Sequence, residues 1–164
     1  MTTTIVAGDA ANVALLEAVV EIDAASSEAL REPRFSIADE IARPFARVFA
    51  ATHQGAASGF LLASAVADEL HIVSVVVLPS HRRLGVGRAL VRAALDHAEA
   101  ARARVVLLEV RRTNVAAVRL YRGLGFVAVH LRPGYYADGE DAVEMAFAHD
   151  AAVLAAFDTL PDDV

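Results

Sequence analysis

Hydrophobic residues follow two different spacings along the chain. After residue 44 come three segments rich in β-branched and aromatic residues, separated by Gly55 and by Asp68-Glu69. This pattern predicts an antiparallel meander, with strands over Phe45–Thr52, Gly59–Ala67 and Leu70–Leu78. Beyond Pro79 the apolar residues recur every three or four positions, which predicts a helix from Gly85 to Arg102. Its predicted apolar face comprises Val86, Leu90, Ala94, Ala98 and Ala101.

The second half of the chain returns to short apolar segments. Val105–Leu108 is a continuous apolar run, which is typical of a strand covered on both faces. A strand, a crossover helix and a second strand imply a parallel, right-handed βαβ unit. A short helix over Val115–Arg122 and two strands over Phe126–Leu131 and Ala142–Ala148 follow. The predicted fold class is therefore α/β, a central, mostly antiparallel sheet with one parallel βαβ unit and flanking helices.

The ends of the chain add smaller elements. Thr3–Ala7 predicts a first strand, and Ala10–Ala25 has apolar residues at helical spacing. Ser36 followed by Asp39 resembles a capping box and predicts a short helix that ends before Pro44. No repeat or low-complexity linker divides the chain. We expect a single domain over residues 1–149 and a C-terminal tail over residues 150–164 with a short helix.

Composition excludes several classes of function. The 164 residues include no cysteine, so disulfides, thiolate nucleophiles and thiolate metal sites are excluded. The six histidines lack the spacing of metal ligands, and we expect no metal. A net charge of −6 argues against broad nucleic-acid binding and favours a cationic substrate. Neither a signal peptide nor a membrane-spanning apolar stretch is recognisable, which predicts a soluble, cytoplasmic protein.

One loop has the features of an anion site. Between the third meander strand and the long helix, residues 82–87 have the pattern R-x-x-G-x-G. Glycines there let backbone N–H groups converge on a ligand, and the helix dipole favours a phosphate. The dinucleotide and Walker fingerprints have different spacings, and the Walker loop needs a lysine, which this chain lacks. By itself the pattern also fits an ordinary turn whose arginines lie on the solvated surface.

Two longer motifs resemble one superfamily. Residues 75–90, VVVLPSHRRLGVGRAL, resemble the acyl-CoA signature V-x-P-x-x-[RQ]-x-x-G-x-[GA] of the GNAT superfamily of N-acetyltransferases. Residues 114–126, NVAAVRLYRGLGF, are similar to its N-x-x-A-x-x-L-Y-x-x-x-G-F motif. Within it, the segments LEVRRTN at 108–114, RPGYY at 132–136 and DGEDA at 138–142 resemble the RimI-type ribosomal-protein N-terminal alanine acetyltransferases. The chain departs from that type at Pro33–Ser36, in the region that shapes the acceptor site, and at Leu78.

The resemblance implies a GNAT-like fold that binds acetyl-CoA. It assigns the pantetheine arm to a bulged strand and the pyrophosphate to the glycine loop, with further contacts from the helix that follows. The implied cofactor-binding residues are Val75, Val76, Val77, Arg82, Arg83, Leu84, Gly85, Val86, Gly87, Arg88, Asn114 and Tyr121. The valines equally suit a buried strand, and Asn114 equally suits an N-cap.

Two residues are candidates for proton transfer. Glu109 follows Val105 and Leu107 on one side of its strand, where a carboxylate is costly unless it has a partner or faces a cleft. The resemblance assigns Glu109 as the general base and Tyr121 as the general acid for the leaving thiolate. The alternatives are a strand-end salt bridge for Glu109 and a packing role for Tyr121.

The acceptor is expected to be an amine. In the family resembled, the loop with Tyr135 and Tyr136 covers the acceptor peptide, although it could instead form an oligomer contact. A set of acidic residues could steer a cationic terminus or simply form a solvated rim: Glu32, Asp138, Glu140 and Asp141. The predicted function is transfer of acetyl to a protein N-terminal α-amine in a ternary complex, since no cysteine can form a covalent intermediate. A small-molecule amine, an internal lysine and a non-catalytic acyl-CoA sensor are the alternatives, and the oligomeric state is left open.

Overall fold

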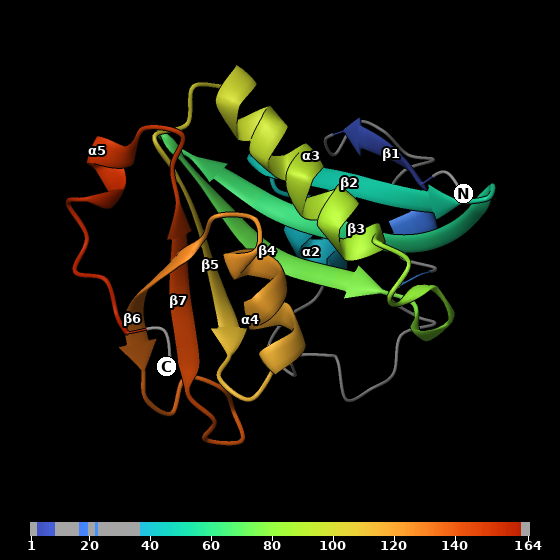
Figure 1. Cartoon of the computed structure of the whole chain (residues 1–164). Helices are drawn as coiled ribbons and strands as arrows, with labels where there is room; N and C mark the ends of the chain where they lie inside the picture. The colour runs from blue at the N-terminus through green and yellow to red at the C-terminus, as the bar shows by residue number, and fades with distance from the viewer. Residues whose placement is uncertain (1–2, 9–16, 20–21, 23–36, 162–164) are drawn as a thin grey trace.

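The computed structural model describes residues 3–8, 17–19, 22 and 37–161, whose strands form one seven-stranded sheet with helices on both faces (Figure 1). The strands are β1 (Thr3–Gly8), β2 (Ala46–His53), β3 (Ala56–Val66), β4 (Glu69–Val77), β5 (Val105–Arg111), β6 (Val127–Arg132) and β7 (Ala142–Phe147). Their order across the sheet is β1-β2-β3-β4-β5-β7-β6. Neighbouring strands are antiparallel except β4 and β5, which are parallel.

The helices are α2 (Ile37–Ile41), the 3-10 turn η2 (Pro79–His81), α3 (Val86–Ala100), α4 (Val115–Arg122) and α5 (Ala151–Leu154). The predicted fold class is confirmed: β2, β3 and β4 form the meander, and α3 connects the parallel strands. In the tail, the predicted short helix is α5, which begins where the Asp150 side chain accepts a hydrogen bond from the Ala152 N–H. The helix predicted over Ala10–Ala25 and the capping Ser36 lie largely outside the described residues. The domain boundaries stay a prediction.

The amphipathic face of α3 is broader than predicted. Val86, Leu90, Ala94 and Ala98 are buried as expected, but Ala101 is exposed and lies beyond the end of the helix. The prediction for Ala101 was therefore wrong. Two further residues of α3 are buried, Val91 and Leu95. The stripe is wide because α3 lies across the centre of the sheet and contacts strands β1 to β5.

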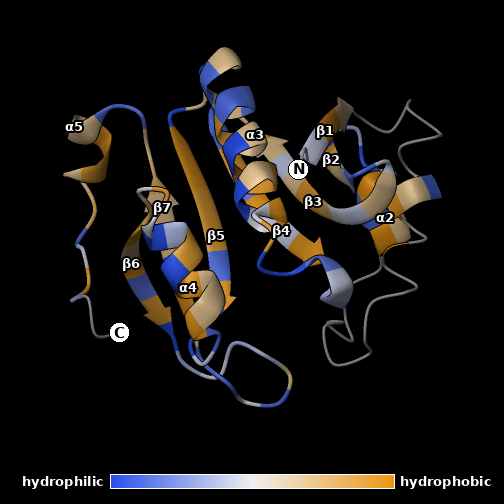
Figure 2. Ribbon diagram, turned by 45° about the vertical axis from the view of Figure 1, so that its right-hand side comes forward, coloured by the Kyte–Doolittle hydropathy of each residue, from blue (hydrophilic) through white to orange (hydrophobic). Residues whose placement is uncertain are grey.

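The two faces of the sheet are covered by different elements. The largest cluster of buried apolar residues lies beneath α3 and α4 and includes alternate residues of β5, namely Val106, Leu108 and Val110. On the opposite face, α2 covers β2 and β3, while Val105 and Leu107 pack beside the C-terminal segment that contains α5. β5 is therefore apolar on both faces over its first half, as Figure 2 shows.

The two parallel strands separate partway along their length. β4 and β5 pair only from Glu69 with Val105 to Ile72 with Leu108. A β-bulge follows at once on β4, because Ile72 pairs with Ala63 and Ser74 with Leu62, which leaves Val73 as the extra residue. The arrowheads of β4 and β5 point apart in Figure 1. Beyond Ile72, no described strand pairs with the edge of β4 that faces β5.

Candidate active site

The predicted anion loop lies at the start of α3. Gly85 is the N-cap of this 15-residue helix and has a φ of 82°, in the left-handed region that glycine adopts without strain. The N–H groups of the first turn of α3 have no partners within the helix, and the helix dipole adds positive potential there. The loop therefore offers backbone donors to an anion, as predicted from its glycines.

Arg82 in the loop and Arg88 in the first turn of α3 both make protein contacts. The Arg82 Nε donates to the Val77 carbonyl at 3.3 Å, at the end of β4. The Arg88 Nη1 donates to the Gly123 carbonyl at 3.3 Å, at the C-terminal end of α4. Leu120 of α4 also lies beside Gly87, since a Cβ built on Gly87 would meet its Cδ2 at 3.4 Å. These contacts join the anion loop to both β4 and α4.

The valines of β4 have a packing role. Val76 is buried on the face that α2 covers, whereas Val75 and Val77 pack against the cluster beneath α3. Their backbone lies on the strand edge that β5 has left, where an extended amide ligand could add hydrogen bonds. The bulge expected at this strand is present, but at Val73.

Glu109 is the first residue of β5 beyond the region that pairs with β4. It lies on the face opposite α3 and α4, because the alternating residues Leu108 and Val110 belong to the cluster beneath those helices. The residue directly opposite Glu109 on the neighbouring strand β7 is Glu144. The Arg132 guanidinium lies between the two carboxylates, with Nη2 at 3.7 Å from the Glu109 Oε1 and at 2.9 Å from the Glu144 Oε2. Glu109 thus has the ion-pair partner that its predicted strand position requires.

Tyr121 lies on the other face of the sheet, in the last turn of α4. Its side chain is 7% exposed and packs edge-on against Phe126 at 5.8 Å between ring centroids. Burial raises the pKa of Tyr121 to about 12, so its phenol is protonated at neutral pH. α4 follows β5 after three residues and lies beside it in Figure 1, so Tyr121 and Glu109 belong to the same region but to opposite faces.

Asn114 is the N-cap of α4. Its side-chain Oδ1 accepts a hydrogen bond from the Ala117 N–H at 3.1 Å. This contact satisfies a backbone donor of the first turn of the helix. The alternative that the sequence left open for Asn114 is therefore observed, and its predicted contact with the cofactor stays a prediction.

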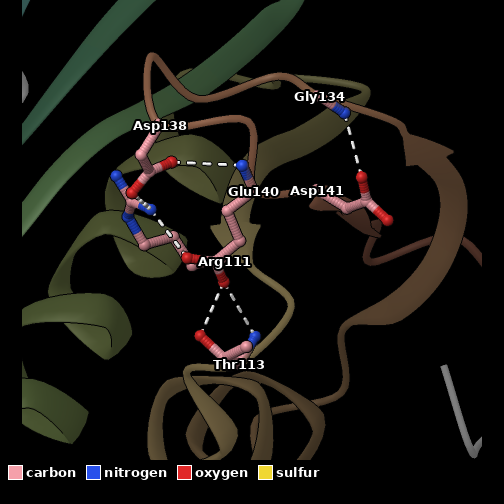
Figure 3. A network of polar contacts seen from close by, with 6 residues as sticks. All are labelled: Arg111, Thr113, Gly134, Asp138, Glu140 and Asp141. Carbon is pink, nitrogen blue, oxygen red and sulfur yellow. Dashed lines mark hydrogen bonds and ion pairs between the residues drawn. The ribbon is translucent and has the colours of Figure 1, made fainter.

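The β6–β7 loop is anchored to the end of β5 by a polar network, shown in Figure 3. Arg111 donates from Nη1 to Asp138 at 2.8 Å and to Glu140 at 2.7 Å. The other oxygen of Glu140 accepts from the hydroxyl and the backbone N–H of Thr113, at 2.6 and 3.0 Å. The Thr113 hydroxyl and then Arg111 lower the pKa of Glu140 to about 2. Asp141 accepts from the Gly134 N–H at 2.9 Å.

This network shows that the acidic residues predicted to steer a cationic terminus have structural partners. Asp138, Glu140 and Asp141 hold the loop in place. Glu32, the fourth of that set, lies outside the described residues, as does the Pro33–Ser36 segment.

The two loop tyrosines lie over arginines. The Arg111 guanidinium is 4.0 Å from the centroid of the Tyr136 ring, and that of Arg132 is 5.6 Å from the Tyr135 ring. The rings themselves meet edge-on at 5.1 Å. Tyr135 is exposed, and its arginine also contacts Glu109, so the structure brings the predicted acceptor loop and the predicted base together.

Sequence reasoning quoted Arg132 only as part of the RPGYY motif and gave no role to it or to Glu144. A signal existed for Glu144, since it interrupts the apolar residues Val143 and Met145 just as Glu109 interrupts its own strand. No local signal identified Arg132 as a partner, because the contact depends on how β5, β7 and β6 align. Within the described part of the chain, no group of three His, Asp or Glu residues could hold a metal ion, and no helix is long and apolar enough to cross a membrane.

Comparison with known proteins gives consistent matches. Residues 16–126 match the model of the Acetyltransferase (GNAT) family. The chain is 49% identical over 77 residues to an N-alpha-acetyltransferase of Sulfurisphaera tokodaii, a match that covers 46% of each, so it spans about half the length of that relative. It is 39% identical over 101 residues to the [ribosomal protein bS18]-alanine N-acetyltransferase of Escherichia coli, covering 60% of this chain and 68% of that protein.

A solved structure resembles the whole chain. The crystal structure of the ribosomal-protein-S18-alanine N-acetyltransferase from Escherichia coli superposes with a TM-score of 0.73 at 27% identity, over 99% of both chains. The family match covers most of the chain, including the anion loop, β5 and α4. The chain therefore belongs to the acetyltransferase (GNAT) family, a family of acyltransferases that take the acetyl group from acetyl-CoA.

Proposed function

We propose that this protein transfers acetyl from acetyl-CoA to the N-terminal α-amine of a protein, of the ribosomal-protein alanine type, by direct attack in a ternary complex. The names of its relatives support a protein N-terminus as acceptor. The observation that supports the reaction best is the point where β4 and β5 separate, with Glu109 on one face of the sheet and Tyr121 on the other. The absence of cysteine supports a ternary complex, because no thiolate is present to carry the acetyl group.

The residues of the loop and of β4 fit the cosubstrate. Gly85 and the first turn of α3 supply backbone donors for the pyrophosphate, and the free edge of β4 supplies amide groups for the pantetheine arm. Arg83 makes no hydrogen bond or ion pair within the described part of the chain, so its charge is available to a phosphate. Bound in this way, the thioester would lie where the two strands separate.

Glu109 would act on the amine. An α-amine near neutral pH is largely protonated and needs to lose a proton before it can attack the thioester carbonyl. The Glu109 carboxylate accepts that proton, directly or through a water. The amine nitrogen then forms a bond to the carbonyl carbon, and the bond from that carbon to sulfur breaks.

Tyr121 would act on the leaving group. As the carbon–sulfur bond breaks, negative charge develops on the sulfur, and the Tyr121 phenol donates a hydrogen bond to it as the general acid of this step. A phenol with a pKa of about 12 is a weaker acid than a thiol, whose pKa is near 8.5, so complete proton transfer to the thiolate is uphill, and a phenolate formed in this way would regain its proton from solvent. The Tyr121 hydroxyl makes no hydrogen bond within the described residues, which leaves it available for this contact.

A peptide panel tests the proposal. Peptides that begin with alanine, serine or methionine are compared with one that is blocked at its N-terminus and has an internal lysine, and with small amines, by release of CoA thiol. We expect the alanine peptide to react fastest. Faster reaction of the lysine peptide or of a small amine would replace the proposed acceptor. No thiol release with any amine, together with tight acetyl-CoA binding, would instead indicate an acyl-CoA sensor.

A further inference from the structure

One face of the sheet changes from apolar to charged at the point where β4 and β5 separate. Strand register places residues of β5, β7 and β6 in rows, and residues directly opposite on antiparallel strands share a face. The last apolar row contains Leu107 and Ala146. The next two rows are Glu109, Glu144 and His130, and then Arg111, Ala142 and Arg132. The proposed base therefore lies in a charged patch in which its direct neighbour is a second carboxylate.

The Arg132 guanidinium is shared unequally between the two carboxylates. Its Nε and Nη2 lie 3.0 and 2.9 Å from the Glu144 Oε2, within hydrogen-bond range. Its closest approach to Glu109 is 3.7 Å, beyond that range. The Glu144 side chain is 17% exposed, Glu109 28% and Arg132 42%. The arginine is thus hydrogen-bonded to Glu144, while its charge lies close to Glu109.

This arrangement solves a problem for a general base. Two carboxylates directly opposite each other repel, and such a pair tends to keep one proton to higher pH. A protonated Glu109 could not accept a proton from the amine. A nearby arginine removes the repulsion, but a short, direct bridge to Glu109 would occupy the oxygen that has to accept the proton. Arg132 held by Glu144 avoids both outcomes.

We propose that Glu144 and Arg132 are positioning residues for Glu109: Glu144 holds the guanidinium where it neutralises the paired carboxylates without bridging the base. This inference rests on the proposed function. The other charged or titratable groups on this face of the paired strands and the β6–β7 loop include Arg111, His130 and Tyr135, and also Glu69 and His71 of β4, which pair with each other at 2.8 Å. Arg111 is bound to Asp138 and Glu140, and Tyr135 lies over Arg132 itself.

The test is the pH dependence of kcat/KM with the best peptide from the panel, using the full chain between pH 5 and 9. In R132M the two carboxylates face each other without a cation. The acid limb of the profile should move up by about half to one pH unit, a shift reduced by the partial exposure of the pair.

In E144Q the freed guanidinium should bridge Glu109. The plateau rate should fall about tenfold, and the acid limb should move down. In the double variant both changes should largely cancel.

Two single variants separate charge from shape. R132K keeps the cation but loses the planar fork and the stacking on Tyr135. The acid limb should stay in place, while the KM for the peptide rises about threefold because Tyr135 loses its support. R104M is the matched control, since Arg104 forms an exposed ion pair with Asp68 at 3.2 Å, next to the β3–β4 turn. It should leave the profile unchanged.

The outcomes distinguish this inference from the proposed function. If R132M and E144Q melt like the wild type and their acid limbs and plateau rates match it, while E109Q is inactive, the positioning roles are wrong and the proposed base stands. Opposite shifts in the two single variants that cancel in the double variant support the inference. If E109Q keeps full activity, Glu109 is not the base, and the inference fails while the acetyl transfer stands. If no peptide is acetylated, the proposed function fails and the inference fails with it.

Discussion

The two faces of the sheet beside the β4–β5 separation are built by different forces. On the α3 and α4 face, Tyr121 is buried among apolar residues and the anion loop offers backbone groups. On the opposite face, Glu109 and the β6–β7 loop are held by ion pairs and hydrogen bonds between partly exposed side chains. Packing fixes the first face, and changes there should affect cofactor binding, departure of the thiolate and stability. Charge fixes the second, and changes there should affect the acceptor and the pH profile.

The largest expected effect is on the charged face. Glu109→Gln keeps the size of the side chain but cannot accept a proton, so turnover should fall by about 10²–10⁴-fold near neutral pH. The loss should shrink at high pH, where the amine deprotonates by itself. Initial rates between pH 6 and 9 with the best peptide measure it. Glu99→Gln, on the exposed side of α3, is the control, and wild-type rates in Glu109→Gln would return Glu109 to a purely structural ion pair.

The next effect is on the packed face. Tyr121→Phe removes only the hydroxyl, so turnover should fall by about 10²-fold while the Kd for acetyl-CoA changes little. Stopped-flow turnover and calorimetric binding measure the two quantities. An unchanged rate would mean that Tyr121 has only a packing role and that the leaving thiolate takes its proton from solvent.

The same residue should affect stability at high pH. Its folded pKa of about 12 is raised above the unfolded value of 10.0, so its contribution is complete below pH 10 and is lost as pH rises to about 12. A difference of two units between the folded and unfolded pKa corresponds to roughly 2–3 kcal/mol in the free energy of unfolding. Urea unfolding should therefore show a smaller loss of stability between pH 10 and 12 in Tyr121→Phe than in the wild type. Equal losses would contradict the burial of this phenol.

A smaller effect is expected at the anion loop. Gly85 and Gly55 share a φ of 82° and have no atom within 4 Å of a built Cβ, but only Gly85 lies at the start of α3. Valine strains the backbone at both sites by about 1–2 kcal/mol. Gly85→Val should raise the Kd for acetyl-CoA about tenfold because the loop shifts, whereas Gly55→Val should lower the melting temperature alone. Equal Kd values in the two variants would exclude the loop as the phosphate site.

The smallest effect concerns the β6–β7 loop. Glu140→Gln weakens the contact with Arg111 but can still accept from Thr113, so we expect the KM for the peptide to rise about threefold with the KM for acetyl-CoA unchanged. Because the folded pKa of Glu140 is about 2, below its usual 4.5, its contribution to stability is lost as pH falls between these values. Acid unfolding should be less steep in Glu140→Gln. A rise in the acetyl-CoA KM instead would place this loop on the cofactor side.

Local patterns predicted most of the packed face. The helical spacing of Val86 and Leu90 predicted α3, and the glycine pattern predicted the loop at its start. Both predictions succeeded because each signal lies within a few consecutive residues. The one error, Ala101, arose because alanine is weakly hydrophobic and the periodicity continues past the point where the helix ends. The wider buried stripe, with Val91 and Leu95, depends on how many strands α3 crosses, which no local pattern gives.

The charged face was only partly predictable. Alternation along β5 placed Glu109 on the side of Val105 and Leu107, and this is confirmed. Its neighbours could not be predicted, because β7 inserts between β5 and β6, and Glu144 and Arg132 meet Glu109 through pairing between strands distant in sequence. The division of Glu109 and Tyr121 between two faces was likewise not foreseen, since it depends on which side of the sheet α4 packs.

The separation of β4 and β5 also has a consequence for the order of events in turnover. A sheet that parts between two strands can accept one reactant from each side, so neither reactant has to depart before the other arrives. Double-reciprocal plots at several fixed peptide concentrations would then intersect rather than run parallel. Free CoA would compete with acetyl-CoA but not with the peptide, and a desamino peptide would show the reverse pattern.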